Sequence, residues 1–197
     1  MQAFSLPASK NQLTPMSRNY KIKDQSKLYF VTFSVVQWID VFTRLVYKDI
    51  LINSFKYCRQ HKGLELYAYV IMTNHVHAIL GTHGKPIQEI IRDFKRHTSK
   101  ELINTIENNQ QESRRNWMLW IFKQAGKQNP NNEFYQFWQQ HNQPIELNTN
   151  QLSDQKLAYI HQNPVEAGFV DEPEAFLYSS ARNYAGLSGL IDVQLIE

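Results

Sequence analysis

The stretch that decides the fold reads Met-Thr-Asn-His-Val-His-Ala-Ile-Leu over residues 72–80. It follows an apolar run over residues 66–71, whose aromatic and β-branched residues are typical of a strand. Asn74 favours a turn, because asparagine tolerates positive φ and can hydrogen-bond its own backbone. The chain then continues as a second strand, in which alternation with period two places His75 and His77 on one face. We therefore predict two strands joined by a tight turn, with paired histidines on the second strand.

Two histidines on one strand face can bind a single metal ion. Side chains on the same face start about 7 Å apart, and their ring nitrogens can converge on one cation at about 2.1 Å. A short pattern of this kind arises often by chance, and two half-exposed histidines are its more frequent outcome. The pair indicates a metal site only if a third ligand and a reactive group occur elsewhere.

Both occur near the other end of the chain. Residues 157–164 read Leu-Ala-Tyr-Ile-His-Gln-Asn-Pro and follow Ser153, which we expect to cap the start of a helix. Pro164 disfavours helical geometry in the residue before it, so we predict that the helix ends near Asn163. Tyr159 and Asn163 are four residues apart and share a face. That face combines a candidate nucleophile, Tyr159, with a candidate amide ligand, Asn163. The same pattern also arises where the tyrosine only packs against the fold and the asparagine before proline only ends the helix.

Together these motifs resemble the single-tyrosine HUH transposases (insertion-sequence-200-like transposases), and within them the branch of REP-associated tyrosine transposases. The resemblance spans roughly residues 17–185, and residues 177–181 are similar to the C-terminal motif of that branch. The sequence departs from the pattern at Thr73, where many relatives have proline, and in a long polar segment over residues 107–133. The residues that carry the resemblance are Met72, Asn74, His75, Val76, His77, Trp138, Gln139, Tyr159, Ile160, Asn163, Pro164, Val165, Ala167 and Gly168.

The resemblance implies an enzyme that nicks and rejoins single-stranded or hairpin DNA. His75, His77 and Asn163 would hold a divalent metal, and Tyr159 would attack phosphorus to form a 5′-phosphotyrosine and release a 3′-OH. Two imidazoles favour Mn²⁺ over Mg²⁺, which prefers oxygen ligands, while abundance and the resemblance favour Mg²⁺. The oligomeric state stays open, with a homodimer as one option, as does whether Tyr159 serves its own site or that of a partner.

Two other functions fit the same residues. One is a non-catalytic nucleic-acid-binding regulator on the same fold, although a pure binder has no need of all four site residues. The other is a metal phosphodiesterase that uses an activated water, with Tyr159 in a structural role only. Covalent trapping of DNA distinguishes all three.

The order of predicted elements indicates one fold class. A strand over residues 28–36 precedes a helix that Thr43 would cap and that would run to Lys62, before Gly63. After the histidine strands, Pro86 opens a second helix, and a short helix that ends at Gly126 follows. A last strand over residues 144–147 precedes the Tyr159 helix. This order predicts an α+β, ferredoxin-like (RRM-like) antiparallel sheet with helices on one face, plus a C-terminal helix that carries the tyrosine.

Length and composition fit one domain. The 197 residues allow a sizeable core, and a hydrophobic content of 42% argues against a disordered chain. We predict a disordered tail over residues 1–16, a single domain over residues 17–185 and a C-terminal tail over residues 186–197. A single cysteine, Cys58, excludes an internal disulfide framework, and no run of 18 apolar residues indicates a membrane span. We expect a cytoplasmic, nucleoid-associated protein of a bacterium.

The charge of the chain is asymmetric. Residues 1–84 and 85–127 have net charges of +6 and +4, whereas residues 128–197 have −7. The positive net charge over residues 1–127 favours a polyanion as binding partner. The second helix has a face of basic residues that are candidate phosphate contacts, namely Arg92, Lys95, Arg96 and Lys100. The simpler interpretation of such a face is that it only contacts solvent. Arg114 and Arg115 are further DNA-binding candidates. We expect the tryptophans that follow them to be core or cover rather than base-stacking platforms.

Overall fold

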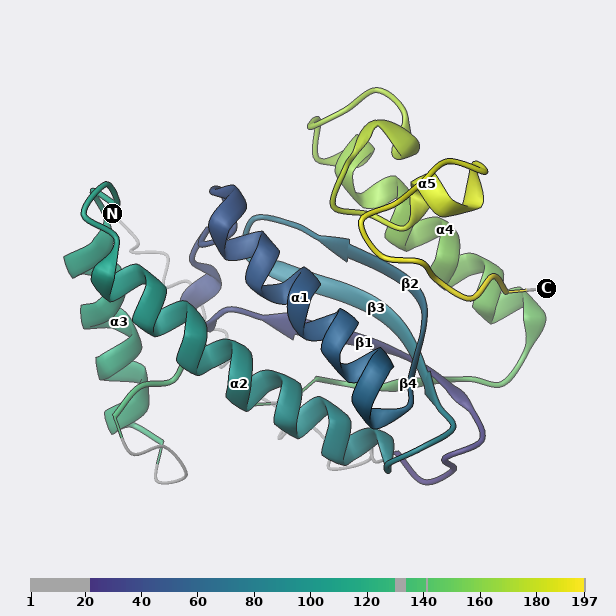
Figure 1. Ribbon diagram of the computed structural model, residues 1–197, viewed down its shortest axis with the longest axis horizontal. Coiled ribbons are helices and arrows are strands. Elements are labelled where there is room, and N and C mark those ends of the chain that lie inside the picture. The colour runs from purple at the N-terminus through teal and green to yellow at the C-terminus, as the bar shows by residue number, and fades with distance from the viewer. Residues whose placement is uncertain (1–21, 130–133, 141, 197) are drawn as a thin grey trace, which may run out of the picture.

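The computed structural model describes residues 22–129, 134–140 and 142–196. Its centre is a four-stranded antiparallel sheet with the strand order β2-β3-β1-β4 (Figure 1). This is the predicted ferredoxin-like topology. The tail predicted over residues 1–16 lies outside the described residues. The elements are β1 (Leu28–Ser34), η1 (Val36–Trp38), α1 (Leu45–Lys62), β2 (Leu64–Ile71), β3 (His75–Thr82), α2 (Ile87–Asn108), α3 (Arg115–Lys127), β4 (Ile145–Leu147), α4 (Asn150–Glu166), η2 (Pro173–Ala175) and α5 (Ala181–Tyr184).

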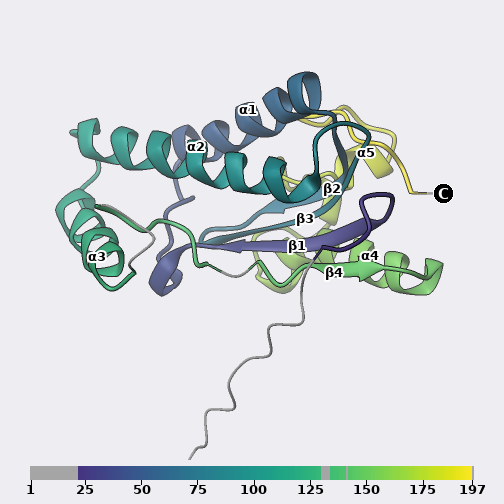
Figure 2. The ribbon, with the colours of Figure 1, turned by 90° about the horizontal axis from the view of Figure 1, so that it is seen from below.

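The sheet is covered on both faces. Helices α1 and α2 lie on one face and α4 lies on the other, as Figure 2 shows. Alternation along the strands sorts the side chains between two cores. Val31, Phe33 and Val76 belong to the larger core under α1 and α2, whereas Phe30 and Ile160 belong to a smaller cluster under α4. The face that carries the histidines is therefore the face that α4 covers.

The helices of the larger core follow the predicted pattern. The apolar residues of α2 at helical spacing are all buried, as expected for the face that contacts a core. Gly63 ends α1 in the left-handed region at φ 72°, where a Cβ would also lie only 2.7 Å from the Cα of Gly84. The predicted cap of α1 is wrong, because the helix begins after Arg44 without a side-chain cap. The hydroxyl of Thr43 instead accepts a hydrogen bond from Arg114.

Helix α4 begins earlier and ends later than predicted. Its first turn is capped by Thr149, whose hydroxyl accepts from the Leu152 N–H at 3.2 Å. Ser153 lies inside the helix and donates to the Thr149 carbonyl. Pro164 also lies inside, in the last turn, and costs the helix one backbone hydrogen bond. The proline ring is buried, so packing against the fold offsets the lost bond and the helix continues to Glu166.

The prediction for the tryptophans of α3 is wrong. Trp117 and Trp120 are exposed, whereas Met118 and Phe122 are buried. A short helix at the edge of a domain buries a single stripe of residues at spacing four. In α3 that stripe holds Met118 and Phe122, so the two indoles point into solvent.

The C-terminal residues follow the outer edge of β2. The carbonyl of Tyr178 accepts from the Ile71 N–H, and the Ser180 N–H donates to the Tyr69 carbonyl, both at 2.9 Å. Residues 190–196, which belong to the predicted C-terminal tail, also pack here, and Ile191 is buried in the larger core. These segments cover an edge that would otherwise expose unpaired backbone groups. Among the described residues, none of the helices has the length and apolar character needed to cross a membrane.

Candidate active site

The structure brings together four residues that are far apart in the sequence. His75 and His77 lie on β3, and Tyr159 and Asn163 lie one turn apart on α4, which covers that face. The ring centroids of the two histidines are 4.6 Å apart, and those of His77 and Tyr159 are 5.1 Å apart. The predicted alternation of β3 and the predicted shared face of α4 together produce this cluster.

His77 is the buried member of the pair, with 6% of its surface exposed. Register places Thr32 of β1 directly opposite, and the two side chains hydrogen-bond at 2.8 Å between Oγ1 and Nδ1. Phe30 stacks on the imidazole, with centroids 5.3 Å apart. Burial, assisted by His75 and by the cation of Lys156, lowers the pKa of His77 to about 3. The ring is therefore neutral at pH 7, and the tautomer that donates from Nδ1 to Thr32 has its lone pair on Nε2.

His75 is arranged in a similar way. Its Nδ1 lies 2.7 Å from the amide oxygen of Asn74, which accepts the ring proton and leaves the lone pair on Nε2. The side chain of Asn163 also hydrogen-bonds to His75. Burial lowers the pKa of His75, while Asn163 and the charge of Asp40 act in the opposite direction. Partners that fix the tautomer of a histidine in this way are typical of metal-binding histidines.

The donor set fits a divalent metal ion. Two neutral imidazoles and the amide oxygen of Asn163 would supply three ligands and leave further positions for substrate. No group of three His, Cys, Asp or Glu side chains among the described residues could hold a metal, so a site at these histidines would take its third protein ligand from the amide of Asn163. A site without a carboxylate leaves the charge of the cation uncompensated. An anionic substrate such as a phosphodiester would therefore add to its stability.

Tyr159 is the candidate nucleophile of this cluster. Its side chain is 42% exposed, and its hydroxyl lies 3.4 Å from Nε2 of His77. A neutral imidazole nitrogen has one lone pair, so Nε2 accepts either the phenol or a cation. The Lys156 ammonium lies 5.7 Å from the centre of the Tyr159 ring and 4.9 Å from that of Phe30.

With this geometry in view, comparison with known proteins shows a similarity to one family of transposases. Residues 28–124, from β1 to α3, match the family model described as "Transposase IS200 like". This match covers 97 of the 197 residues. The match includes both histidines but ends before α4, so the assignment of Tyr159 and Asn163 rests on their geometry. Among curated proteins, none matches this chain in sequence.

One solved structure shares the fold of this chain over most of its length. The chain is similar to a REP-associated tyrosine transposase bound to a REP hairpin, with a TM-score of 0.61 and 15% identity over 92% of this chain and 94% of that one. A putative transposase from Deinococcus radiodurans R1 is less similar, with a TM-score of 0.40 and 17% identity over 76% of this chain and 97% of that one. The first comparison confirms the predicted fold.

The structure does not bring the basic row of α2 next to the histidines. Helix α2 lies on the opposite face of the sheet (Figure 2). Arg92 and Arg96 hydrogen-bond to Asp93 there, and Lys100 is exposed. Lys95 instead points inward and donates to the Gln139 carbonyl at 2.7 Å and to the Asn142 side chain. Burial lowers the pKa of Lys95 to about 8, and its contacts indicate a structural anchor for the segment before β4.

The two arginines at the start of α3 differ in their surroundings. Arg114 donates to the buried carboxylate of Glu112 and to the Asp40 carbonyl, so it ties α3 to the segment before α1. Arg115 hydrogen-bonds to the side chain of Gln110 near the surface. Arg115 therefore makes fewer hydrogen bonds within the fold than Arg114 does.

The sequence analysis missed several residues around the candidate site. Thr32 and Phe30 contact His77, Trp38 contacts His75, and Lys156 lies beside Tyr159. Alternation along β1 places Phe30 and Thr32 on one face, but only the pairing of β1 with β3 shows that this is the histidine face. The position of Lys156 beside Tyr159 could have been predicted, since the two residues are three apart on a predicted helix.

Proposed function

We propose that this protein nicks and rejoins DNA through a covalent bond to Tyr159. The observation that carries the proposal is the placement of the Tyr159 hydroxyl 3.4 Å from His77, within a cluster that suits a divalent metal. Phosphoryl transfer needs an in-line nucleophile and neutralisation of the charge on the phosphate. The cluster offers a group for each of these requirements.

In the proposed reaction, the Tyr159 oxygen forms a bond to phosphorus while the bond from phosphorus to the 3′ oxygen breaks. The phenol loses its proton, the leaving oxygen gains one, and the products are a 5′-phosphotyrosine and a 3′-OH. Because one phosphate ester replaces another, the reverse reaction rejoins the strand without an external energy source. A Mg²⁺ or Mn²⁺ ion held by His75, His77 and Asn163 would neutralise charge on the phosphate.

Single-stranded or hairpin DNA is the proposed substrate. The family is one of transposases, and the structural neighbour with the same fold is described as bound to a REP hairpin. Lys156 supports an anionic ligand, because its ammonium lies near Tyr159 and forms no ion pair among the described residues. A DNA substrate would place the protein with the chromosome.

The test is covalent trapping. We expect the wild-type protein, incubated with Mn²⁺ and a hairpin-bearing single strand from the flanks of its own gene, to form an adduct that survives denaturing electrophoresis. Peptide mapping should locate the DNA on Tyr159. A regulator would bind without cutting, and a phosphodiesterase that uses water would cut without an adduct, so either result contradicts the proposal.

A second expectation concerns the basic face of α2. If Arg96 and Lys100 contact phosphates, the Arg96→Gln/Lys100→Gln variant should bind single strands more weakly, whatever their sequence. The slope of log affinity against log salt should become shallower by about 1.4, from about 0.7 for each lost contact. Lys95 is left intact because it anchors the fold. An unchanged slope would show that this face is only solvated.

A further inference from the structure

The turn after β1 holds an aromatic side chain out in solvent. Trp38 is 57% exposed, although an indole of this size usually buries most of its surface. Gln37 and Trp38 have φ values of 56° and 54°, in the left-handed region that bulky residues rarely adopt. Backbone strain of this kind persists where surrounding structure enforces it, and it is common at ligand sites. Here the side chain of Asn74 donates to the Trp38 carbonyl and helps to hold the turn.

The exposed indole lies beside the candidate active site. Its ring centroid is 6.0 Å from that of His75, with the two planes near perpendicular at 69°. His75 is its only ring contact within the described part of the chain. More than half of the indole surface is therefore available to a flat ligand next to the histidines.

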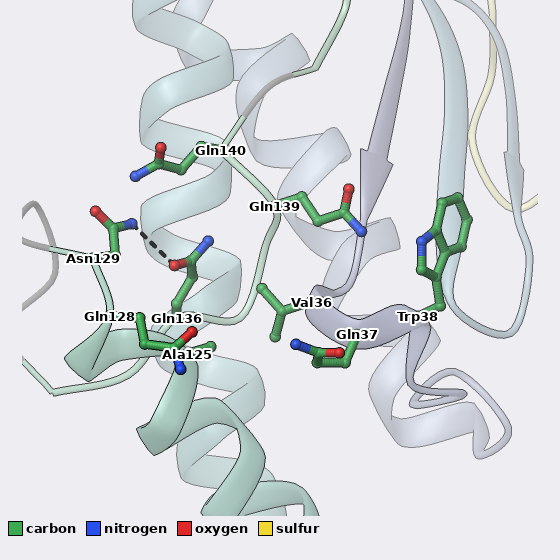
Figure 3. Close-up of a pocket in the computed structure, with 9 residues that line it drawn as sticks. All are labelled: Val36, Gln37, Trp38, Ala125, Gln128, Asn129, Gln136, Gln139 and Gln140. Atoms are coloured by element: carbon green, nitrogen blue, oxygen red, sulfur yellow. Dashed lines mark hydrogen bonds between the residues drawn. The ribbon is translucent and has the colours of Figure 1, made fainter. Parts of the chain in front are cut away.

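Trp38 also forms one end of an open groove of about 690 Å³ between the turn and the end of α3. This volume lies within the range of about 300–1,000 Å³ that is typical of ligand sites. Figure 3 shows Trp38 at one end and Gln128 with Asn129 at the other. As far as the structure describes it, the lining contains no charged side chain and is dominated by amides, including Gln37, Gln136, Gln139 and Gln140.

The chemistry of the groove suits nucleobases better than phosphates. An amide offers both a donor and an acceptor, as the edges of bases do, whereas phosphate contacts favour cations. Gln136 and Gln139 donate to the carbonyls of Trp138 and Val35, which fixes their orientation. The side chains of Gln37 and Gln140 are exposed at the surface of the groove. An aromatic platform beside amides is therefore a site for unpaired nucleotides.

We propose that Trp38 stacks on an unpaired base next to the cleaved phosphodiester, and that the groove holds the adjoining nucleotides of the same strand. The proposal rests on the proposed function, because it takes the histidine cluster as the cleavage site. What it adds is the assignment of this unpaired strand to Trp38 and the amide-lined groove. Stacking would accept any base, and the amides would supply preference among bases.

Binding without metal tests the groove. The probes are a fluorescein-labelled hairpin with an unpaired mixed-sequence tail of about eight nucleotides, in a 5′-tailed and a 3′-tailed form, and the same hairpin with a blunt end. In EDTA, Trp38→Ala should weaken binding of one tailed form about five- to hundredfold and leave the blunt hairpin unaffected. Trp38→Phe keeps an aromatic face and should retain most of the affinity.

Trp117→Ala is the matched control, because Trp117 is similarly exposed, at 51%, but does not line the groove. Its affinity for the tailed hairpins should equal that of the wild type. A second readout avoids any effect on folding: 5-iodouracil in the tail of the favoured probe should photocrosslink to Trp38 of the wild-type protein. Crosslinks only at other residues would overturn the proposal, as would equal affinity of Trp38→Ala and wild type.

The results for the groove and for the proposed function can be distinguished. Trp38-dependent binding without any covalent adduct would support the proposal for the groove and contradict the proposed nicking reaction. Adduct formation together with unchanged DNA binding by Trp38→Ala would support the proposed reaction and contradict the proposal for the groove.

Discussion

Tyr159→Phe should form no covalent adduct and should lose cleavage by about 10⁴-fold or more, as expected when a covalent nucleophile is removed. The substitution deletes the hydroxyl and keeps the ring that contacts Phe30 and His77. Within the described parts of the chain, the only hydrogen bond of this hydroxyl is the long contact to Nε2 of His77. Folding and DNA affinity should therefore stay close to those of the wild type, because phosphate and base contacts supply the affinity.

Cleavage of a hairpin substrate, adduct formation and thermal unfolding should be measured on the same preparations. Tyr57→Phe is the matched control, since Tyr57 is 53% exposed but lies on α1, on the other side of the sheet. It should cut and form the adduct as the wild type does. Persistent cleavage by Tyr159→Phe would show that water is the nucleophile, even though the fold and the metal site could remain as described.

The parts of the fold that depend on local periodicity could be predicted from the sequence. Alternation along β3 places His75 and His77 on one face, and helical spacing places the apolar residues of α2 against the sheet. These patterns are strong because a shift by one residue would expose a whole apolar face. The shared face of Tyr159 and Asn163 follows from the same geometry, since residues four apart lie one helical turn from each other.

Features that depend on contacts across the fold could not be predicted in this way. Thr32 becomes the partner of His77 only through the register of β1 against β3. Lys95 looks like its surface neighbours in the sequence, yet its ammonium reaches the segment before β4, which is 44 residues away. Pro164 stays within α4 because its ring is buried, and burial is a tertiary property that overrides the local preference.

The metal hypothesis gives the second large effect. The His75→Ala/His77→Ala variant should show no measurable Mn²⁺ binding by calorimetry and no cleavage, because it loses both imidazole ligands. Asn163→Ala should weaken binding less, since an amide oxygen is a neutral ligand that water can partly replace. Affinity of the wild type for Mn²⁺ should rise when a bound oligonucleotide supplies the negative charge that the protein ligands lack.

Thr32→Val makes the sharper test, because valine keeps the shape of threonine and removes only the hydroxyl that hydrogen-bonds to Nδ1 of His77. Loss of such a supporting partner typically weakens metal binding about 10- to 100-fold. His61→Ala is the control, since His61 is exposed on α1, outside the cluster, and its loss should leave Mn²⁺ affinity unchanged. If the double histidine variant bound Mn²⁺ as tightly as the wild type, the cluster could not be the metal site. If Thr32→Val alone had wild-type affinity, His77 would not need Thr32 to present Nε2.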